Sequence, residues 1–175
     1  RWDAAEVVAE YFGTSSRYVG TYYDVYAALD PEGRQWKFMT DGSTDTRRKE
    51  NGKVIAADRD YSTEMVSPIC RYEDIVAIQE IIRKLKEQGA FVNKSCGIHV
   101  HIDASPFDAR TLRNITNIMA SKEELIYKAL DVSVDRQHRF CKPVDERFLE
   151  ELNRKKPKAL EGVERIWYGG NSRSR

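Results

Sequence analysis

The sequence predicts an α+β fold, with strands concentrated in the first part of the chain and helices in the second. Three observations support this prediction: a turn signal between two apolar runs near the start, a strictly alternating stretch at residues 96–103, and apolar residues at helical spacing over residues 72–88. With 175 residues, 41% of them hydrophobic, the chain can bury a sizeable core as one domain.

The charge balance and the cysteines exclude several classes of protein. The 29 Lys and Arg residues nearly cancel the 28 Asp and Glu residues, so no net field attracts nucleic acid or a membrane. No apolar run approaches the roughly 18 residues of a membrane span, and no signal-peptide pattern opens the chain. Three widely spaced cysteines do not predict a disulfide framework. We therefore expect a soluble, cytoplasmic protein with no nucleic-acid and no membrane partner; its oligomeric state stays open.

The first half of the chain is expected to contribute a helix and four strands. Gly13 suits the end of the first helix, and Asp30-Pro31-Glu32-Gly33 is a turn signal that predicts a hairpin. Residues 47–52 look like a charged link. The expected elements are a helix over residues 3–12, a hairpin of residues 22–28 and 35–39, and strands over residues 54–56 and 61–66.

From residue 72 onward, apart from the stretch at residues 96–103, the chain is expected to be mainly helical. An apolar stripe runs through residues 72–88, and Ser121-Lys122-Glu123-Glu124 is a capping box that predicts a new helix start. We expect helices over residues 72–88, 112–119, 121–130 and 145–154, an irregular basic segment at residues 135–139, and a flexible tail at residues 169–175.

The stretch at residues 96–103 reads Cys-Gly-Ile-His-Val-His-Ile-Asp and alternates strictly. As a half-buried strand, it places its branched apolar residues on one face and His99, His101 and Asp103 on the other. Neighbours on that polar face lie roughly 6–7 Å apart. We interpret the row as a metal or phosphate site, although His-x-His serves zinc, iron and manganese sites alike.

Three other positions could carry chemistry or could be ordinary surface residues. Asp41 lies in an acidic, glycine-containing loop directly after a strand, which is either a catalytic loop or plain turn chemistry. Glu64 lies within a strand, where glutamate is depleted, so it is either a ligand or a solvated edge residue. Arg136 could bind phosphate or carboxylate, or could simply be solvated.

Three motifs, at residues 41–43, 63–68 and 96–101, resemble in order and spacing the amidoligases. These are a branch of the carboxylate–amine ligases, which include glutamine synthetase and glutamate–cysteine ligase. The likeness covers nearly the whole chain, and Cys-Gly-Ile-His-Val-His is its most specific part. The resemblance implies a curved, mostly antiparallel sheet with helices packed on one side, the glutamine synthetase-like catalytic fold. It also implies that ATP phosphorylates a carboxylate and that an amine then attacks the acyl phosphate to form an amide.

The resemblance also implies a role for each candidate residue. Glu64 and His99 correspond to metal ligands, and His101 would reach a nucleotide phosphate or a second metal. Asp41 corresponds to the loop aspartate that binds the incoming amine and helps take its proton. Arg136 would neutralise phosphate or the acyl phosphate. The implied cofactors are ATP and Mg²⁺ or Mn²⁺, and the implied substrates are a small-molecule or peptide carboxylate and an amine.

The sequence departs from the family pattern at both ends. The pattern begins with a strand carrying Glu-x-Glu and ends with a strand carrying an acidic and a basic residue, and this chain has neither; Glu6 and Glu10 lie on a predicted helix. We therefore expect residues 1–175 to be one amidoligase-like domain, a section of a longer protein without those flanking strands.

Two other functions stay open. His99, His101 and Glu64 could form a three-ligand site with an open position in a metal-dependent hydrolase or oxygenase. The chain could also be a catalytically degenerate binding module. Dependence on a nucleotide separates the ligase from the hydrolase.

Overall fold

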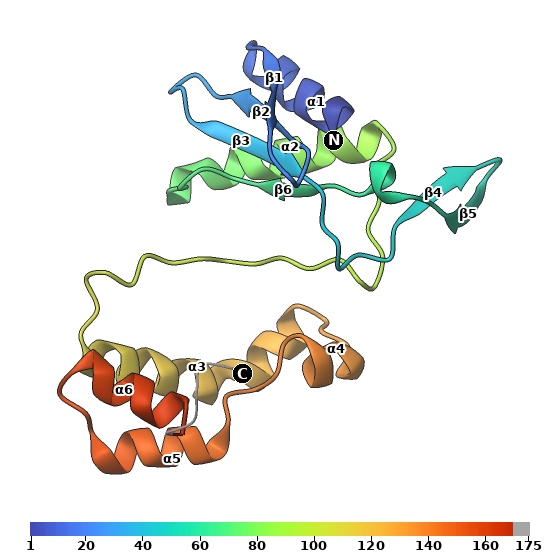
Figure 1. Cartoon of the computed structure of the whole chain (residues 1–175). Coiled ribbons are helices and arrows are strands. Elements are labelled where there is room, and N and C mark those ends of the chain that lie inside the picture. The colour runs from blue at the N-terminus through green and yellow to red at the C-terminus, as the bar shows by residue number, and fades with distance from the viewer. Residues whose placement is uncertain (170–175) are drawn as a thin grey trace. The chain divides into compact units, whose positions relative to one another are not determined.

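The computed structural model describes residues 1–169, which form two compact units, each described here by itself (Figure 1). The first unit is Arg1–His99, and the second begins at Val100. The first unit contains α1 (Trp2–Phe12), β1 (Ser16–Gly20), β2 (Val25–Leu29), β3 (Gln35–Met39), β4 (Arg47–Glu50), β5 (Lys53–Ala56), η1 (Arg59–Tyr61), β6 (Glu64–Val66), η2 (Tyr72–Asp74) and α2 (Ile75–Glu87).

The main sheet of the first unit has four antiparallel strands in the order β1-β2-β3-β6. It is open, with β1 and β6 at its edges. The register pairs Ala28 with Trp36, and Phe38 with Met65. These four side chains therefore share one face of the sheet, because directly opposed residues point to the same side.

Helices α1 and α2 both pack on this face of the sheet. The core cluster joins apolar residues from α1 and α2 with strand residues of that same face: Ala5, Val8, Ala9, Ala28, Trp36, Phe38 and Ile81. Both helices are amphipathic, and α1 ends at Gly13, whose φ of 66° is a left-handed conformation that glycine adopts without strain. The prediction of an α+β chain with antiparallel strands and helices is confirmed, and so is the prediction that Gly13 ends the first helix.

The predicted hairpin is present, and its turn is held by an ion-pair network. Asp30, only 3% exposed, accepts hydrogen bonds from the backbone N–H and the guanidinium of Arg34 and from the indole N–H of Trp36. Arg34 in turn donates two bonds to Asp74, at 2.9 and 2.8 Å. The network therefore ties the β2–β3 turn to the residues that begin α2.

Two strands were missed, and two predicted strands are shorter: the strand expected over residues 22–28 begins only at Val25, because residues 21–24 form a turn. Residues 47–50, expected as a charged link, form β4 and pair with β5. The turn between them is Asn51-Gly52, both with positive φ (49° and 75°), which suits a two-residue hairpin turn. β1 was not expected either. β6 covers only the last residues of the predicted strand 61–66, although Glu64 and Met65 point to opposite faces as predicted.

The described part of the second unit is helical, with α3 (Ala109–Ala129), α4 (Val134–Arg139), α5 (Glu146–Lys155) and α6 (Leu160–Trp167). Two helices expected over residues 112–130 are one continuous helix, because the Ser121 hydroxyl donates to the Ile118 carbonyl instead of capping a new start. Residues 135–139, expected to be irregular, lie in α4, and α6 was not expected. The prediction of α5 is confirmed to within one residue at each end.

None of the helices in residues 1–169 is both long enough and apolar enough to cross a membrane. The expected flexible tail at residues 169–175 lies, apart from Gly169, outside the described residues.

The strand expected at residues 96–103 is not formed. Residues 97–103 have no regular secondary structure, and Ile98, Val100 and Ile102 are 93%, 80% and 74% exposed. Alternation predicts which side chains share a face, but a strand also needs a neighbouring strand to take its backbone hydrogen bonds. Within residues 1–169 this segment pairs with no strand.

Candidate active site

Asp41 lies in the loop that leaves β3, and its carboxylate is held by the loop itself. Its Oδ1 accepts hydrogen bonds from the backbone N–H of Ser43, at 2.7 Å, and from the Ser43 hydroxyl, at 2.6 Å. This is the local aspartate turn that the sequence suggested. It fixes the direction of the side chain at a half-buried position, which suits a group that must receive a ligand.

Ser62 ties this loop to the strand that carries Glu64. The hydroxyl of Ser62 donates to the Asp41 carbonyl at 3.2 Å and lies 3.1 Å from the hydroxyl of Thr44. Ser62 is only 5% exposed, and it comes two residues before Glu64. The buried hydroxyl of Ser62 therefore ties the backbone of Asp41 to the residues just before Glu64.

Glu64 lies on the face of the sheet that α1 and α2 leave open. It is directly opposite Met39, and Asp41 follows Met39 by two residues. Its neighbour Met65 packs against the core on the helix-covered face. The structure therefore places both candidate carboxylates near the end of β3.

A second group of hydrogen bonds joins the Asp41 loop to the segment leading into Cys96. The backbone N–H of Asp45 donates to the Ser95 hydroxyl at 2.9 Å, and the Asn93 side chain donates to the Asp45 carbonyl at 2.7 Å. Ser95 donates in turn to Asn93 Oδ1 at 2.6 Å. We call Asn93 and Ser95 the latch. The latch holds the start of the histidine segment, residues 96–103, against the loop that contains Asp41.

The β1–β2 turn borders the same end of the sheet and is strained. Thr21, a β-branched residue, has a φ of 83°, which such residues rarely adopt. The guanidinium of Arg1, paired with Asp24 of this turn, also donates to the Ser62 carbonyl at 3.2 Å. The backbone N–H of Thr40 donates to the Tyr23 carbonyl. Arg1 therefore supports Ser62, which binds the Asp41 loop, and Tyr23 binds the residue just before Asp41.

The remaining candidates lie on other segments of the chain. His99 and His101 lie in the irregular segment, and Arg136 lies on α4 with its guanidinium 5.2 Å from the ring centre of Phe140. A carboxylate with two imidazoles suits Mn²⁺ and, when phosphates and waters complete the shell, Mg²⁺. Among residues 1–169, however, no three His, Cys, Asp or Glu side chains converge as a metal site.

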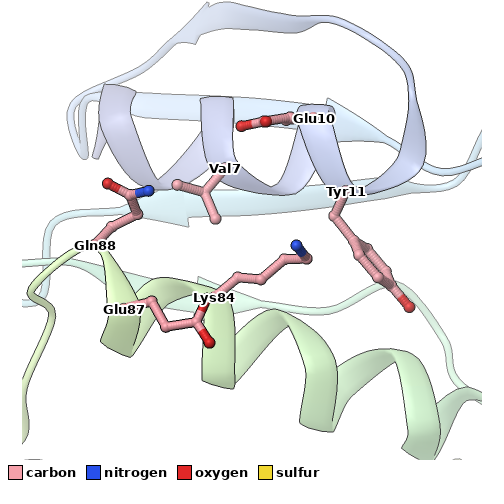
Figure 2. Close-up of a pocket in the computed structure, with 6 residues that line it drawn as sticks. All are labelled: Val7, Glu10, Tyr11, Lys84, Glu87 and Gln88. Carbon is pink, nitrogen blue, oxygen red and sulfur yellow. The ribbon is translucent and has the colours of Figure 1, made fainter.

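A pocket of about 260 Å³ lies between α1 and α2 and contains none of the candidate residues (Figure 2). It is lined by Val7, Glu10, Tyr11, Lys84, Glu87 and Gln88. Helices α1 and α2 cover the face of the sheet opposite the one that carries Glu64. The pocket is therefore separate from the candidate site.

Sequence reasoning missed Ser62 and the latch. Asn93-Lys94-Ser95 is turn chemistry that could have been noticed, since asparagine and serine often bond to nearby backbone groups. Ser62 gave no such signal, because its partners Asp41 and Thr44 are distant in sequence.

Comparison with known families agrees with the resemblance of the motifs. The model of a family described as "putative amidoligase enzyme" matches residues 1–175. The comparisons with curated proteins and with solved structures gave no match.

Proposed function

We propose that this chain, which belongs to the amidoligase family, is an ATP-dependent carboxylate–amine ligase that forms an amide through an acyl phosphate. The family match over all 175 residues supports a ligase-type enzyme. The observation that carries the proposal within the structure is the anchoring of Asp41, through Ser62, to the strand of Glu64.

The proposed chemistry has two steps. A carboxylate oxygen of the acid attacks the γ-phosphorus of ATP, and ADP leaves. The amine nitrogen then attacks the carbonyl carbon of the acyl phosphate, and phosphate leaves. The amine must lose a proton, and we assign the binding of the ammonium and the acceptance of that proton to the carboxylate of Asp41, which Ser43 holds. Phosphoryl transfer itself depends mainly on positioning and on cations at developing charge.

The proposed cofactors are ATP and Mg²⁺ or Mn²⁺. Glu64, His99 and His101 supply donors suited to such a cation, and His101 could also meet a nucleotide phosphate. The cation would neutralise charge on the phosphates. Within residues 1–169 no three His, Cys, Asp or Glu side chains converge as a metal site. Arg136 remains our proposal for neutralising the acyl phosphate, supported by its always-charged guanidinium.

The first test is calorimetric titration of Mn²⁺-ATP into the wild-type chain and into His99→Ala. The chain has three histidines, and the third, His138 on α4, offers a matched control. We expect saturable binding to the wild type and to His138→Ala, and at least tenfold weaker binding to His99→Ala, with circular dichroism unchanged in all three.

Equal binding by folded His99→Ala would remove the histidine from the nucleotide site. A wild-type chain that does not bind Mn²⁺-ATP, but hydrolyses amides or esters with metal alone, would overturn the ligase in favour of a metal-dependent hydrolase.

A further inference from the structure

The open face of the main sheet carries a row of residues that the proposed function has not yet used. The register pairs Arg17 with Ala27, Ala27 with Lys37, and Lys37 with Val66. These residues alternate with the buried Trp36 and Phe38, so they point away from α1 and α2. The row therefore places two cations on the face that also carries Glu64.

Neither cation of this row is neutralised by a carboxylate of the described chain. Arg17 and Lys37 form no ion pair with any other of the residues 1–169, whereas Arg1, Arg34, Arg47 and Arg48 all do. Lys37 is half-buried, and Ala27 beside it is only 1% exposed. A half-buried ammonium without a counter-ion attracts an anion more strongly than a fully solvated lysine does.

The position of Lys37 relative to the candidate carboxylates is ordered along β3. Lys37, Met39 and Asp41 follow at two-residue intervals, and Glu64 is opposite Met39. At about 3.3 Å per residue of strand, Lys37 and Met39 lie roughly 7 Å apart along β3, with Glu64 beside Met39. A cation and a proposed metal ligand therefore share one face of the sheet, and the loop that carries Asp41 begins where β3 ends.

Resting on the proposed ligase function, we propose that Lys37 binds the reacting carboxylate of the acid substrate and that Arg17 binds a second anionic group of the same molecule. The substrate is then an acid with two anionic groups, such as a dicarboxylate or an acidic peptide. Lys37 and Arg17 are two strands apart, so their backbones are separated by two spacings of about 4.8 Å, or roughly 10 Å. Both side chains are long enough to reach the two ends of a small dicarboxylate bound between them. Lys37 is the binding residue nearest to the chemistry, and Arg17 determines specificity.

Charge complementarity supports an acid as the occupant of this row. A carboxylate–amine ligase needs a cation at its acid and an anion at its amine; the open face offers the cations at Lys37 and Arg17, and the loop after β3 offers the anion at Asp41. The amine would be repelled at the row and attracted at the loop. Nucleotide phosphates share the anionic chemistry of a carboxylate, so the test has to separate the two sources.

The test follows the lysine and arginine side-chain signals by NMR while glutarate, a dicarboxylate, or butyrate, a monocarboxylate, is added to the full chain. The variants are Lys37→Met, Arg17→Met and, as a matched control, Lys53→Met on the exposed β5. We expect glutarate to shift the signals of Lys37 and Arg17 and to bind at least tenfold more tightly than butyrate. Lys37→Met should abolish binding of both probes. Arg17→Met should reduce the affinity for glutarate to that for butyrate, and Lys53→Met should leave both affinities unchanged.

The proposed site would be overturned if Lys53→Met weakened glutarate binding as much as Lys37→Met does, or if glutarate left the Lys37 signals unshifted. Competitive displacement of glutarate by tripolyphosphate at tenfold lower concentration would overturn it too, because the row would then serve the nucleotide. Parallel Mn²⁺-ATP titrations separate this proposal from the ligase function. If the chain binds glutarate but not ATP, the ligase function is contradicted and the row remains a site for dianions. If the chain binds ATP but glutarate does not bind at Lys37, the ligase function stands and the proposed acid site is wrong.

Discussion

Asp41 shows how one residue can serve both a turn and a reaction. Its Oδ1 closes the turn on Ser43, and that bond needs only an oxygen acceptor, not a charge. The proposed capture of an ammonium and its proton, in contrast, needs the carboxylate. The two roles can therefore be separated by a substitution that keeps the oxygen and removes the charge.

We predict that Asp41→Asn keeps the fold and Mn²⁺-ATP binding but lowers the rate of amide formation by at least a hundredfold, since general base catalysis contributes about 10²–10⁴-fold. Amide formation and thermal unfolding are the measurements. Asp58→Asn is a suitable control, because Asp58 closes a similar turn with the N–H of Asp60. An unfolded Asp41→Asn chain would mean that the aspartate was turn chemistry alone.

At the scale of the structural elements, the latch joins the loop after β3 to the segment that leads into the histidines. Asn93 and Ser95 bind both backbone groups of Asp45, in the way that a neighbouring strand would. Because these are side-chain bonds across about 50 residues of sequence, they hold the start of the histidine segment at one place on the first unit.

We predict that Ser95→Ala makes the backbone N–H of Asp45 exchange with solvent several-fold faster and lowers the free energy of unfolding by about 1 kcal/mol, the net worth of an ordinary hydrogen bond. Hydrogen exchange followed by NMR and urea unfolding are the measurements. Ser67→Ala, which removes an exposed bond to the Pro68 carbonyl, should change neither. Unchanged exchange at Asp45 would show that the latch does not hold the loop.

The ion-pair network of the β2–β3 turn should make the first unit sensitive to acid. Hydrogen bonds from Arg34 hold the pKa of Asp74 well below its usual range. Burial alone would raise the pKa of Asp30, but bonds from Arg34 and Trp36 lower it overall. A depressed folded-state pKa gives stability that is present above the unfolded-state pKa of about 4 and is lost as the pH falls below it.

We predict that wild-type stability falls between pH 5 and pH 2, and that Asp74→Asn is less stable at neutral pH but loses less over that acid range. Urea unfolding at several pH values, followed by tryptophan fluorescence to which the buried Trp36 contributes, measures this. Asp3→Asn removes a carboxylate outside the network and should keep the wild-type pH dependence. The same dependence in Asp74→Asn would contradict the role of the network.

The elements that could be predicted from sequence are those whose signals are local. The turn Asp30-Pro31-Glu32-Gly33 and the end of α1 at Gly13 follow from residues close in sequence. β4 had such a signal in Asn51-Gly52 and could have been found. The alternation of residues 96–103 describes two faces but no partner, so a strand there could not be established from the pattern alone.

At the scale of the whole molecule, the candidate site could be predicted as a set of residues but not as an arrangement. The sequence indicated Asp41 and Glu64, and the structure brings them to one end of β3 through Ser62. It does not bring His99 and His101 into a metal site with Glu64 among the described residues. Pairings between residues distant in sequence decide such arrangements, and no periodicity encodes them.

We propose that this chain, a member of the amidoligase family, uses ATP to activate a carboxylate for attack by an amine. The most direct measurement supplies Mg²⁺-ATP, hydroxylamine as a general amine, and a panel of acids labelled with ¹⁸O in the carboxylate, and follows hydroxamate and phosphate by mass spectrometry. We expect one hydroxamate for each ADP formed, with one ¹⁸O atom transferred to the phosphate. Cleavage of ATP without transfer of ¹⁸O, or hydroxamate formed without ATP, would contradict it.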